Sequence, residues 1–476
     1  MLSKNDFLTI LQQQIPFQFT KSQEVVAQML TDFVCAPAEN QLFVLNGYAG
    51  TGKTTLVGAL VRTLKGFRKN CILLAPTGRS AKVFSLYASQ KAYTIHKCLY
   101  YSKMKDGVRI FSRRPNRLQN TIFIVDEASM IADGVVDTPV FGNSSLLEDL
   151  FSYVFEGQNC QLLLVGDAAQ LPPVHFEESP ALDVDYIKRN FSLNANSCSL
   201  VDVTRQSQNS GILYNATRLR NKMSRNECSF PLFSPPVYPD CQRIDGEELE
   251  ELLHSLYAKH EPDDIVVITY SNKRAYIYNQ EIRHRILYRE EQLAAGDYLI
   301  AVKNNYFWIQ DDREVGFLAN GDAMEILSIN KRQELYGFHF ADVTVRLCDY
   351  PNHDNVDIKI ILESLDSENA SLSEEQSEAL YHAVSEDYAD IPTKKEFYAK
   401  MKSDPFLNAV QVKFSYAMTC HKTQGGQWAC VLLDQGLIRD GILTKSYLRW
   451  LYTALTRATQ QVYLINFNDS FFESQV

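Results

Sequence analysis

Short, almost continuously apolar runs recur along the chain, separated by segments in which apolar residues return every three to four positions. Apolar runs of four or five residues between helical patterns are typical of parallel strands, because such strands are buried on both faces. Seven runs share this pattern: Leu42–Leu45, Cys71–Ala75, Ile122–Val125, Gln161–Val165, Ile265–Thr269, Cys430–Leu433 and Val462–Ile465. Several end in polar or glycine-rich clusters, where parallel sheets bind ligands. The pattern therefore predicts an α/β fold with its functional residues after the strands.

Two stretches depart from this alternation. Between residues 97 and 119, two segments flank Asp106-Gly107, a dipeptide that favours a tight β-hairpin turn. From about Leu293 to Leu365 the apolar runs are short and separated by turn residues, which predicts a small β-barrel. Its expected strands are Tyr298–Val302, Ala323–Ile329, Val343–Leu347 and Val356–Leu362. A helical and strongly acidic stretch, from about Ser373 to Lys402, follows the last strand.

The length, charge and cysteine content of the chain limit the classes of protein to which it can belong. The chain has 476 residues, which favours several domains over one core. Nine Asp and Glu residues between positions 360 and 393, a stretch without Lys or Arg, account for nearly all of the net charge of −10. The remainder is almost neutral, so charge does not exclude a nucleic-acid partner. Scattered cysteines without a C-x-x-C pair, and no apolar stretch of membrane-spanning length, predict a cytoplasmic protein without a membrane partner.

The strongest chemical signal is a glycine-rich loop, residues 47–54, between a predicted strand and an amphipathic helix. Its sequence, G-Y-A-G-T-G-K-T, matches the phosphate-binding pattern G-x-x-x-x-G-K-[ST]. The glycines let backbone N–H groups converge on a polyphosphate at the start of a helix. Lys53 can reach the β- and γ-phosphates, and the Thr54 hydroxyl can bind Mg²⁺. The residues expected to hold the nucleotide are Gly47, Gly50, Thr51, Gly52, Lys53, Thr54 and Thr55.

Three polar residues follow predicted strands and suit hydrolysis of a bound nucleotide. Asp126 can hold Mg²⁺, and Glu127 is placed to take a proton from the attacking water. Gln170, after the run Gln161–Val165, can sense the γ-phosphate and orient that water. The alternative interpretation of all three is ordinary solvated polarity.

Two arginines could also act on a bound phosphate, and one polar segment near the end of the chain could contact a nucleic acid. Arg205 and Arg457 carry guanidinium groups that could stabilise a phosphoryl group in transfer, although an isolated Arg more often forms a surface ion pair. The segment Thr419–Gln424 offers hydroxyl, imidazole, ammonium and amide donors. Two glycines follow it and allow close approach. This composition is typical of contacts to a phosphodiester backbone.

The order of these motifs, from the glycine-rich loop to Thr-Ala-Leu-Thr-Arg-Ala at residues 453–458, resembles that of the superfamily 1 DNA helicases, and most closely the RecD/Dda-like branch. The resemblance covers nearly the whole chain. It implies two RecA-like domains with ATP and Mg²⁺ in the cleft between them, Arg205 and Arg457 arriving from the second domain. It further implies 5′→3′ movement on single-stranded DNA, unwinding of tailed duplexes, and roles in DNA replication, recombination or repair.

The same resemblance divides the chain into domains. The first RecA-like domain would span residues 1–195 and contain the hairpin of residues 97–119, which resembles a strand-splitting pin. The second would comprise residues 196–290 and 406–476. Residues 291–405 would form an inserted SH3-like barrel with the acidic helical stretch.

Individual residues can be matched to the family's motifs. Gln23 resembles the residue that reads the adenine base. At the pin, Phe111, or Tyr100 and Tyr101, could stack on a base or could equally be core aromatics. The residues that match DNA-contact motifs are Pro76, Thr77, Thr94, His96, Lys97, Asn272, Thr419, His421, Lys422 and Gln424.

Alternatives to the helicase interpretation remain at this level. One is a single-strand translocase that displaces proteins without efficient unwinding. Another is a nucleotide-gated DNA-binding scaffold, against which the presence of Glu127, Gln170 and both arginines argues. The acidic residues 363–390 suit a solvated face, a wall that repels the strand, or a site for a protein partner. The protein itself is expected to be a monomer.

Overall fold

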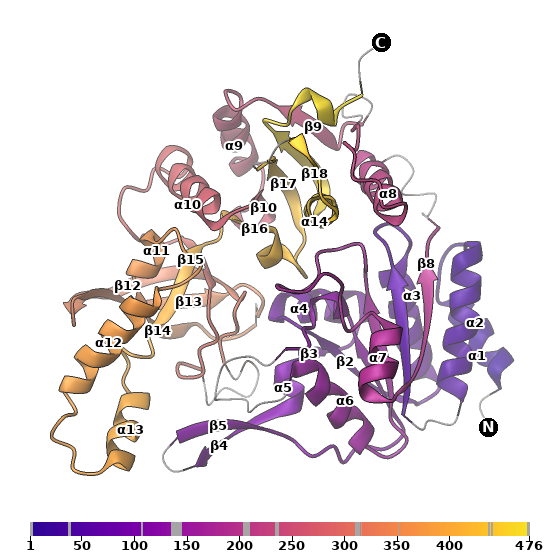
Figure 1. Ribbon diagram of the computed structural model, residues 1–476, viewed down its shortest axis with the longest axis horizontal. Helices are drawn as coiled ribbons and strands as arrows, with labels where there is room; N and C mark the ends of the chain where they lie inside the picture. Colours follow the sequence, from indigo (N-terminus) through magenta and orange to yellow (C-terminus); the bar gives the residue numbers. More distant parts are fainter. Residues whose placement is uncertain are drawn as a thin grey trace.

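The chain folds into two α/β domains, a β-barrel and a projecting β-hairpin (Figure 1). Within residues 102–111 only the backbone of the hairpin is described. The computed structural model describes residues 3–36, 40–105, 108–134, 145–202, 210–233, 238–309, 315, 317–350, 352–436, 438 and 441–473.

The first domain is built on a six-stranded parallel sheet of order β3-β2-β6-β7-β1-β8. Alternate residues of its strands pack on opposite faces, as Leu42 and Phe43 of β1 do. The four strands predicted in this half are confirmed. The strands are β1 (Gln41–Gly47), β2 (Asn70–Ala75), β3 (Ala92–Thr94), β6 (Thr121–Val125), β7 (Gln161–Gly166) and β8 (Asn194–Leu200).

Helices cover both faces of this sheet, which explains why the predicted runs in its central strands are almost continuously apolar. One face packs against α1 (Lys4–Gln13), α2 (Lys21–Cys35), α3 (Lys53–Gly66) and α4 (Gly78–Ala88). The other packs against α5 (Ile95–Leu99), α6 (Leu146–Glu156) and α7 (Val184–Phe191). A short 3₁₀ helix, η1 (Ala128–Met130), follows β6.

The second domain repeats this architecture with a five-stranded parallel sheet of order β16-β10-β17-β18-β9. Its strands are β9 (Cys241–Ile244), β10 (Ile265–Thr269), β16 (Ala417–Thr419), β17 (Trp428–Asp434) and β18 (Ala458–Ile465). One face packs against α8 (Gly211–Ser224) and α14 (Lys445–Leu455), the other against α9 (Leu249–Tyr257) and α10 (Asn272–Glu281). Short helical turns are η4 (Pro262–Asp264), η5 (Ile282–Ile286, π-helical), η6 (Cys420–Thr423) and η8 (Asp469–Phe471).

The predicted barrel is present, and its core is continuous with one face of the second sheet. Its strands are β11 (Tyr298–Ala301), β12 (Ala323–Leu335), β13 (Phe338–Leu347), β14 (Val356–Ile361) and β15 (Val410–Phe414). Helices α11 (Glu363–Asp366), α12 (Glu374–Glu386) and α13 (Lys394–Lys402) lie between the last two strands. The acidic helix α12 buries Leu380 and Val384 against Phe340 of the barrel.

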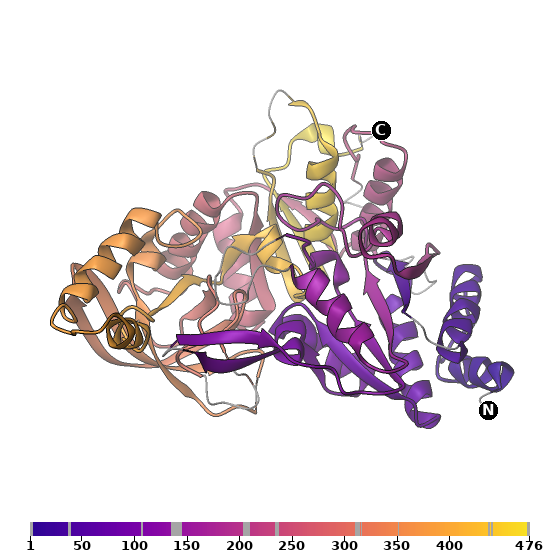
Figure 2. The ribbon, with the colours of Figure 1, turned by 60° about the horizontal axis from the view of Figure 1, so that its bottom comes forward.

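The hairpin consists of β4 (Tyr100–Lys105) and β5 (Val108–Arg113), paired antiparallel. It projects from the first domain below the barrel, towards α13 (Figure 1), and in the turned view of Figure 2 it lies in front of the barrel. Tyr100 is buried and its hydroxyl donates to Asp149 at 2.6 Å, so Tyr100 is a core aromatic at the hairpin's base. Tyr101 is 39% exposed. Asp106 and Gly107 lie outside the described residues, as does the side chain of Phe111.

Strand pairing moves two of the expected domain boundaries. β8 pairs with β1, so the first sheet extends beyond residue 195 to Leu200. β15 closes the barrel, so the insert extends beyond residue 405 to Phe414. Among the described helices, none combines the length and the apolarity of a bilayer-crossing segment.

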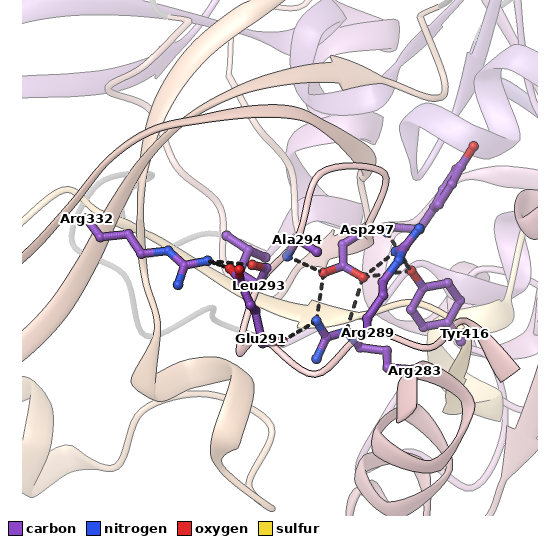
Figure 3. Close-up of polar contacts among 9 residues, drawn as sticks. Arg283, Arg289, Glu291, Leu293, Ala294, Asp297, Arg332 and Tyr416 are labelled. Carbon is purple, nitrogen blue, oxygen red and sulfur yellow. Dashed lines mark hydrogen bonds and ion pairs between the residues drawn. The ribbon is translucent and has the colours of Figure 1, made fainter. Parts of the chain in front are cut away.

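A buried ion-pair network joins the barrel to the second domain where the chain enters and leaves the barrel (Figure 3). The fully buried carboxylate of Asp297 accepts hydrogen bonds from Arg283 at 3.0 and 3.1 Å and from Arg289 at 2.5 Å. The Tyr416 hydroxyl, just after β15, donates to the same carboxylate at 3.0 Å. Both connecting segments are therefore tied to one charged group.

We expect Asp297→Ala to lower the free energy of unfolding by about 3–5 kcal/mol, because it leaves the buried Arg283 without its counter-charge. Urea denaturation followed by tryptophan fluorescence measures this change. The control is Glu291→Ala, which breaks the exposed ion pair with Arg332 and should cost at most about 1 kcal/mol. Equal effects of the two substitutions would contradict the structural role of the network.

Candidate nucleotide site and nucleic-acid groove

The glycine-rich loop, residues 47–54, connects β1 to α3 and forms a phosphate cradle. Gly50 and Gly52 have φ angles of 74° and 77°, in the left-handed region that favours glycine. A side chain at Gly47 would lie 2.9 Å from Cδ of Lys53, so the lysine packs back over the end of β1. The free N–H groups at the start of α3 then face the position of a polyphosphate.

Two buried carboxylates stand beside Lys53 at the ends of β6 and β7. Burial raises the pKa of Asp126 and that of Asp167, while the positive charge of Lys53 opposes both shifts. The Tyr87 hydroxyl and the backbone N–H of Glu127 donate to Asp126. These bonds hold the Asp126 carboxylate beside the cradle.

Two of the residues predicted to act in hydrolysis each have a buried oxygen atom without a hydrogen-bond partner within the described part of the chain. These atoms are Oε2 of Glu127 and Oε1 of Gln170. Glu127 also has a φ of 52°, an unfavourable conformation for a non-glycine residue that is frequent at functional sites. Buried polar atoms normally have partners. The orphaned pair therefore fits a site for water and a charged ligand.

The donor set at the cradle suits Mg²⁺. The expected ligands, the Thr54 hydroxyl and the Asp126 carboxylate, are hard oxygen donors, and Mg²⁺ bound with a nucleotide takes most other ligands from phosphate and water. The described residues contain no cluster of three or more His, Cys, Asp or Glu side chains able to hold a metal alone. A metal here would therefore be bound together with the nucleotide.

The second domain contacts the cradle through residues that the sequence did not single out. The Tyr452 hydroxyl, on α14, accepts from the Ala49 N–H at 2.9 Å and donates to Asp167 at 2.6 Å. The Arg220 guanidinium, on α8, lies 4.6 Å from the centre of the Tyr48 ring. Tyr452 directly precedes the motif of residues 453–458, which contains Arg457. This proximity is the sequence signal that could have identified Tyr452 as a residue near the nucleotide.

Three residues expected at the nucleotide have other partners or lie outside the described chain. Arg457 is buried and donates to the carbonyl oxygens of Thr453 and Gly426 in its own domain, at 3.1 and 3.2 Å. Both polar ends of the Gln23 amide are engaged, with Thr20 and with the Thr51 carbonyl of the cradle. Arg205 lies outside the described residues. Their roles at the nucleotide stay predictions.

A groove of about 660 Å³ runs between the two domains and the barrel. It brings together six of the residues matched to DNA-contact motifs: Thr77, Asn272, Thr419, His421, Lys422 and Gln424. Arg79 and Tyr270, which the sequence analysis did not name, also line it, and Asn320 and Gly321 of the barrel form part of its wall. Burial lowers the pKa of Lys422 to about 8 and also lowers that of His421.

The remaining matched residues lie apart from the groove lining. Thr94 and Lys97 line a second cavity, of about 210 Å³, together with Lys82 and Lys91. The His96 ring packs against Phe317 of the barrel segment, and burial lowers its pKa to about 4. Pro76 lies between β2 and α4. Gln424, which does line the groove, also donates from its amide to the Leu171 carbonyl of the first domain at 2.7 Å.

Two family models match the chain. The model of an AAA domain matches residues 32–176, which contain the cradle, Asp126 and Gln170. The model of the UvrD-like helicase C-terminal domain matches residues 414–465, which contain His421, Lys422 and Arg457. The matched segments therefore include the cradle, the carboxylates beside it and residues 419–424 of the groove.

Curated relatives agree with these models. The chain is 34% identical over 140 residues to the ATP-dependent RecD2 DNA helicase of Deinococcus radiodurans. It is 30% identical over 183 residues to the ATP-dependent DNA helicase dda of Enterobacteria phage T4. These matches span 17% and 37% of the two relatives' lengths. An uncharacterized protein of Acanthamoeba polyphaga mimivirus is 20% identical over 93% of this chain and 99% of its own length.

Among solved structures, the Pif1 helicase from Bacteroides in complex with ADP-AlF3 and ssDNA is similar with a TM-score of 0.46. It is 14% identical, with 96% of this chain and 95% of that chain covered. At this TM-score and sequence identity, the similarity says nothing about the function of this chain.

We expect Gly47→Ala to weaken nucleotide binding by about tenfold, or about 1.4 kcal/mol, because the new methyl group displaces Lys53 from the cradle. Titration with a fluorescent ADP analogue measures the affinity. Gly66→Ala, at the end of the same helix α3, is the matched control because nothing lies within 4 Å of the added carbon. The interpretation fails if Gly47→Ala binds the analogue as tightly as this control.

Proposed function

Since the chain belongs to the superfamily 1 helicases, in the RecD/Dda-like branch, we propose that it is an ATP-dependent DNA helicase that moves 5′→3′ along single-stranded DNA. The observation that carries the proposal is that the phosphate cradle and the groove both lie where the two domains meet. The cradle meets the second domain at Tyr452, and the groove is lined by both domains. One movement of the domains therefore changes both sites.

Hydrolysis follows from the residues at the ends of β1, β6 and β7. Lys53 and the N–H groups of α3 bind the polyphosphate, and Thr54 and Asp126 would hold Mg²⁺, which neutralises phosphate charge when bound. Glu127 accepts a proton from the water that attacks the γ-phosphorus, while the bond to the bridging oxygen breaks. Gln170 orients that water through its free Oε1 atom.

The arginines complete the site from the second domain. Arg457 would exchange its carbonyl partners for the γ-phosphate when ATP occupies the cradle. By the family resemblance, Arg205 is expected to supply a second guanidinium. A guanidinium stabilises the charge that spreads over the oxygens of the phosphoryl group in transfer. Hydrolysis then requires closure of the two domains.

Movement on DNA follows from the composition of the groove. Thr77 comes from the first domain, whereas Asn272 and Lys422 come from the second. When the domains close and reopen, the two sets of contacts shift relative to one another, and a strand held alternately by each set advances. The hairpin of β4 and β5 is the candidate for splitting a duplex ahead of the groove.

The test is an ATPase assay with and without single-stranded oligonucleotides, followed by unwinding of 5′- and 3′-tailed duplexes of DNA and RNA. We expect DNA-stimulated turnover and opening of 5′-tailed DNA. Opening of 3′-tailed duplexes alone would overturn the polarity. Stimulated turnover without strand separation would instead support the translocase, and absence of turnover the scaffold.

We expect Glu127→Gln to lower turnover by about 100-fold or more, because glutamine cannot accept the proton from water. The substitution keeps the size of the side chain, so binding of an ADP analogue should change little. Turnover at the wild-type rate would show that Glu127 is not the general base.

We expect affinity for single-stranded DNA to fall as the pH rises from 7 to 9. The pKa of Lys422 is about 8, so its ammonium predominates below that pH and is lost above it. Neighbouring Lys413, whose pKa burial also lowers to about 8, titrates in the same range. Fluorescence anisotropy with a labelled oligonucleotide measures the trend. Lys422→Arg should flatten the profile, and an unchanged profile would exclude Lys422 as the titrating contact.

A further inference from the structure

The loop that carries Gln170 belongs to the first domain, but the second domain holds it at both ends. We call residues 167–171, between β7 and the following prolines, the sensor loop. At its start, Asp167 accepts from the Tyr452 hydroxyl at 2.6 Å. At its end, the Leu171 N–H donates to the Thr453 hydroxyl at 2.8 Å, and the Leu171 carbonyl accepts from the Gln424 amide at 2.7 Å.

Tyr452 links the sensor loop to the phosphate cradle. Its single hydroxyl donates to Asp167 and accepts from the Ala49 N–H, so both of its hydrogen-bonding roles span the domain boundary. Tyr452 is 1% exposed and Thr453 is fully buried. Hydrogen bonds excluded from water in this way cannot be replaced by solvent without opening the interface.

Gln170 lies between the two held ends. Within the loop, its N–H donates to the Asp167 carbonyl at 3.2 Å, and the Asp167 side chain also accepts from the Ala169 N–H at 2.9 Å. Both of these bonds are internal to the loop. The position of the loop relative to the cradle is therefore set from outside it, by groups of the second domain.

We propose that Tyr452 is a positioning residue that makes ATP hydrolysis conditional on closure of the second domain onto the first. With the domains closed, Tyr452, Thr453 and Gln424 hold the sensor loop so that Gln170 faces the cradle. When the domains part, Ala49, Asp167 and Leu171 lose these partners and Gln170 is no longer oriented. The inference rests on the proposed function and names the regulation of the same site.

The contact of Gln424 extends this control to the groove. Gln424 is in the segment with His421 and Lys422, which lines the groove. Its amide donates to the sensor loop rather than into open space. A strand bound along this segment would therefore act on the loop through the Gln424 side chain, and this contact would couple DNA binding to turnover.

The test is Tyr452→Phe, which keeps the buried ring and removes only the hydroxyl. We expect the DNA-stimulated kcat to fall by about tenfold, while KM for ATP and the affinity for an ADP analogue stay within about threefold. Tyr447→Phe is the matched control. It removes a hydroxyl from the same helix, α14, whose hydrogen bond to the Gln435 carbonyl stays inside the second domain.

Hydrogen exchange gives a readout that does not depend on turnover. In the wild-type protein the amides of Ala49 and Leu171 should exchange slowly, and Tyr452→Phe should accelerate exchange at Ala49, whereas Tyr447→Phe should not. Thr453→Val should accelerate exchange at Leu171. Combining Tyr452→Phe with Thr453→Val should lower kcat by less than the product of the separate effects, because both act on one loop.

Several results would overturn the inference. Wild-type kcat in Tyr452→Phe, unchanged exchange at Ala49, or an equal loss of kcat in Tyr447→Phe would each do so. If Tyr452→Phe changed kcat, KM and the melting temperature together, Tyr452 would have a structural role only. If the wild-type protein shows no DNA-stimulated turnover, the proposed function fails. The hydrogen-exchange experiment still decides whether Tyr452 holds the phosphate cradle and the sensor loop.

Discussion

The buried charge of Asp297 is the constraint on which the arrangement of the domains depends. A carboxylate without water must be paired, and its partners Arg283, Arg289 and Tyr416 come from both segments that connect the barrel to the second domain. The barrel is thereby fixed at its two crossings, and its core is continuous with that of the second domain. The barrel and the second domain therefore form one packed unit.

This unit meets the first domain along the groove. A Cβ atom at Gly78, at the start of α4, would lie 2.9 Å from both the Asp322 carboxylate and the Tyr350 hydroxyl of the barrel, so the backbone of α4 approaches the barrel closely here. Lys82 donates to the Cys348 carbonyl at 2.8 Å, and Arg79 stacks 4.1 Å from the ring of Trp428. The groove wall is consequently made by three parts of the chain.

Much of the fold could be predicted because buried parallel strands carry a strong apolar signal. All seven predicted core strands, the barrel and the hairpin are present. The boundaries shifted where that signal is weak: β8, with the sequence Asn-Ala-Asn-Ser-Cys-Ser-Leu, is a polar edge strand stabilised by its pairing with β1. β15 joins the barrel only through pairing with strands more than 40 residues away along the chain.

The sequence alone predicted the phosphate cradle, the carboxylates after β6 and the hydrogen-bond donors of residues 419–424. Each of these groups is formed by residues that are close together along the chain. The partners of these groups depended on contacts between distant segments. Tyr452, Thr453 and Gln424 act on a loop more than 250 residues away, and no local pattern distinguishes them from core or strand-contact residues. Packing of the two domains assigned Gln424 to the sensor loop, and packing of the hairpin's base on α6 within the first domain assigned Tyr100 to the core. Complementary surfaces of this kind arise only from the folded chain.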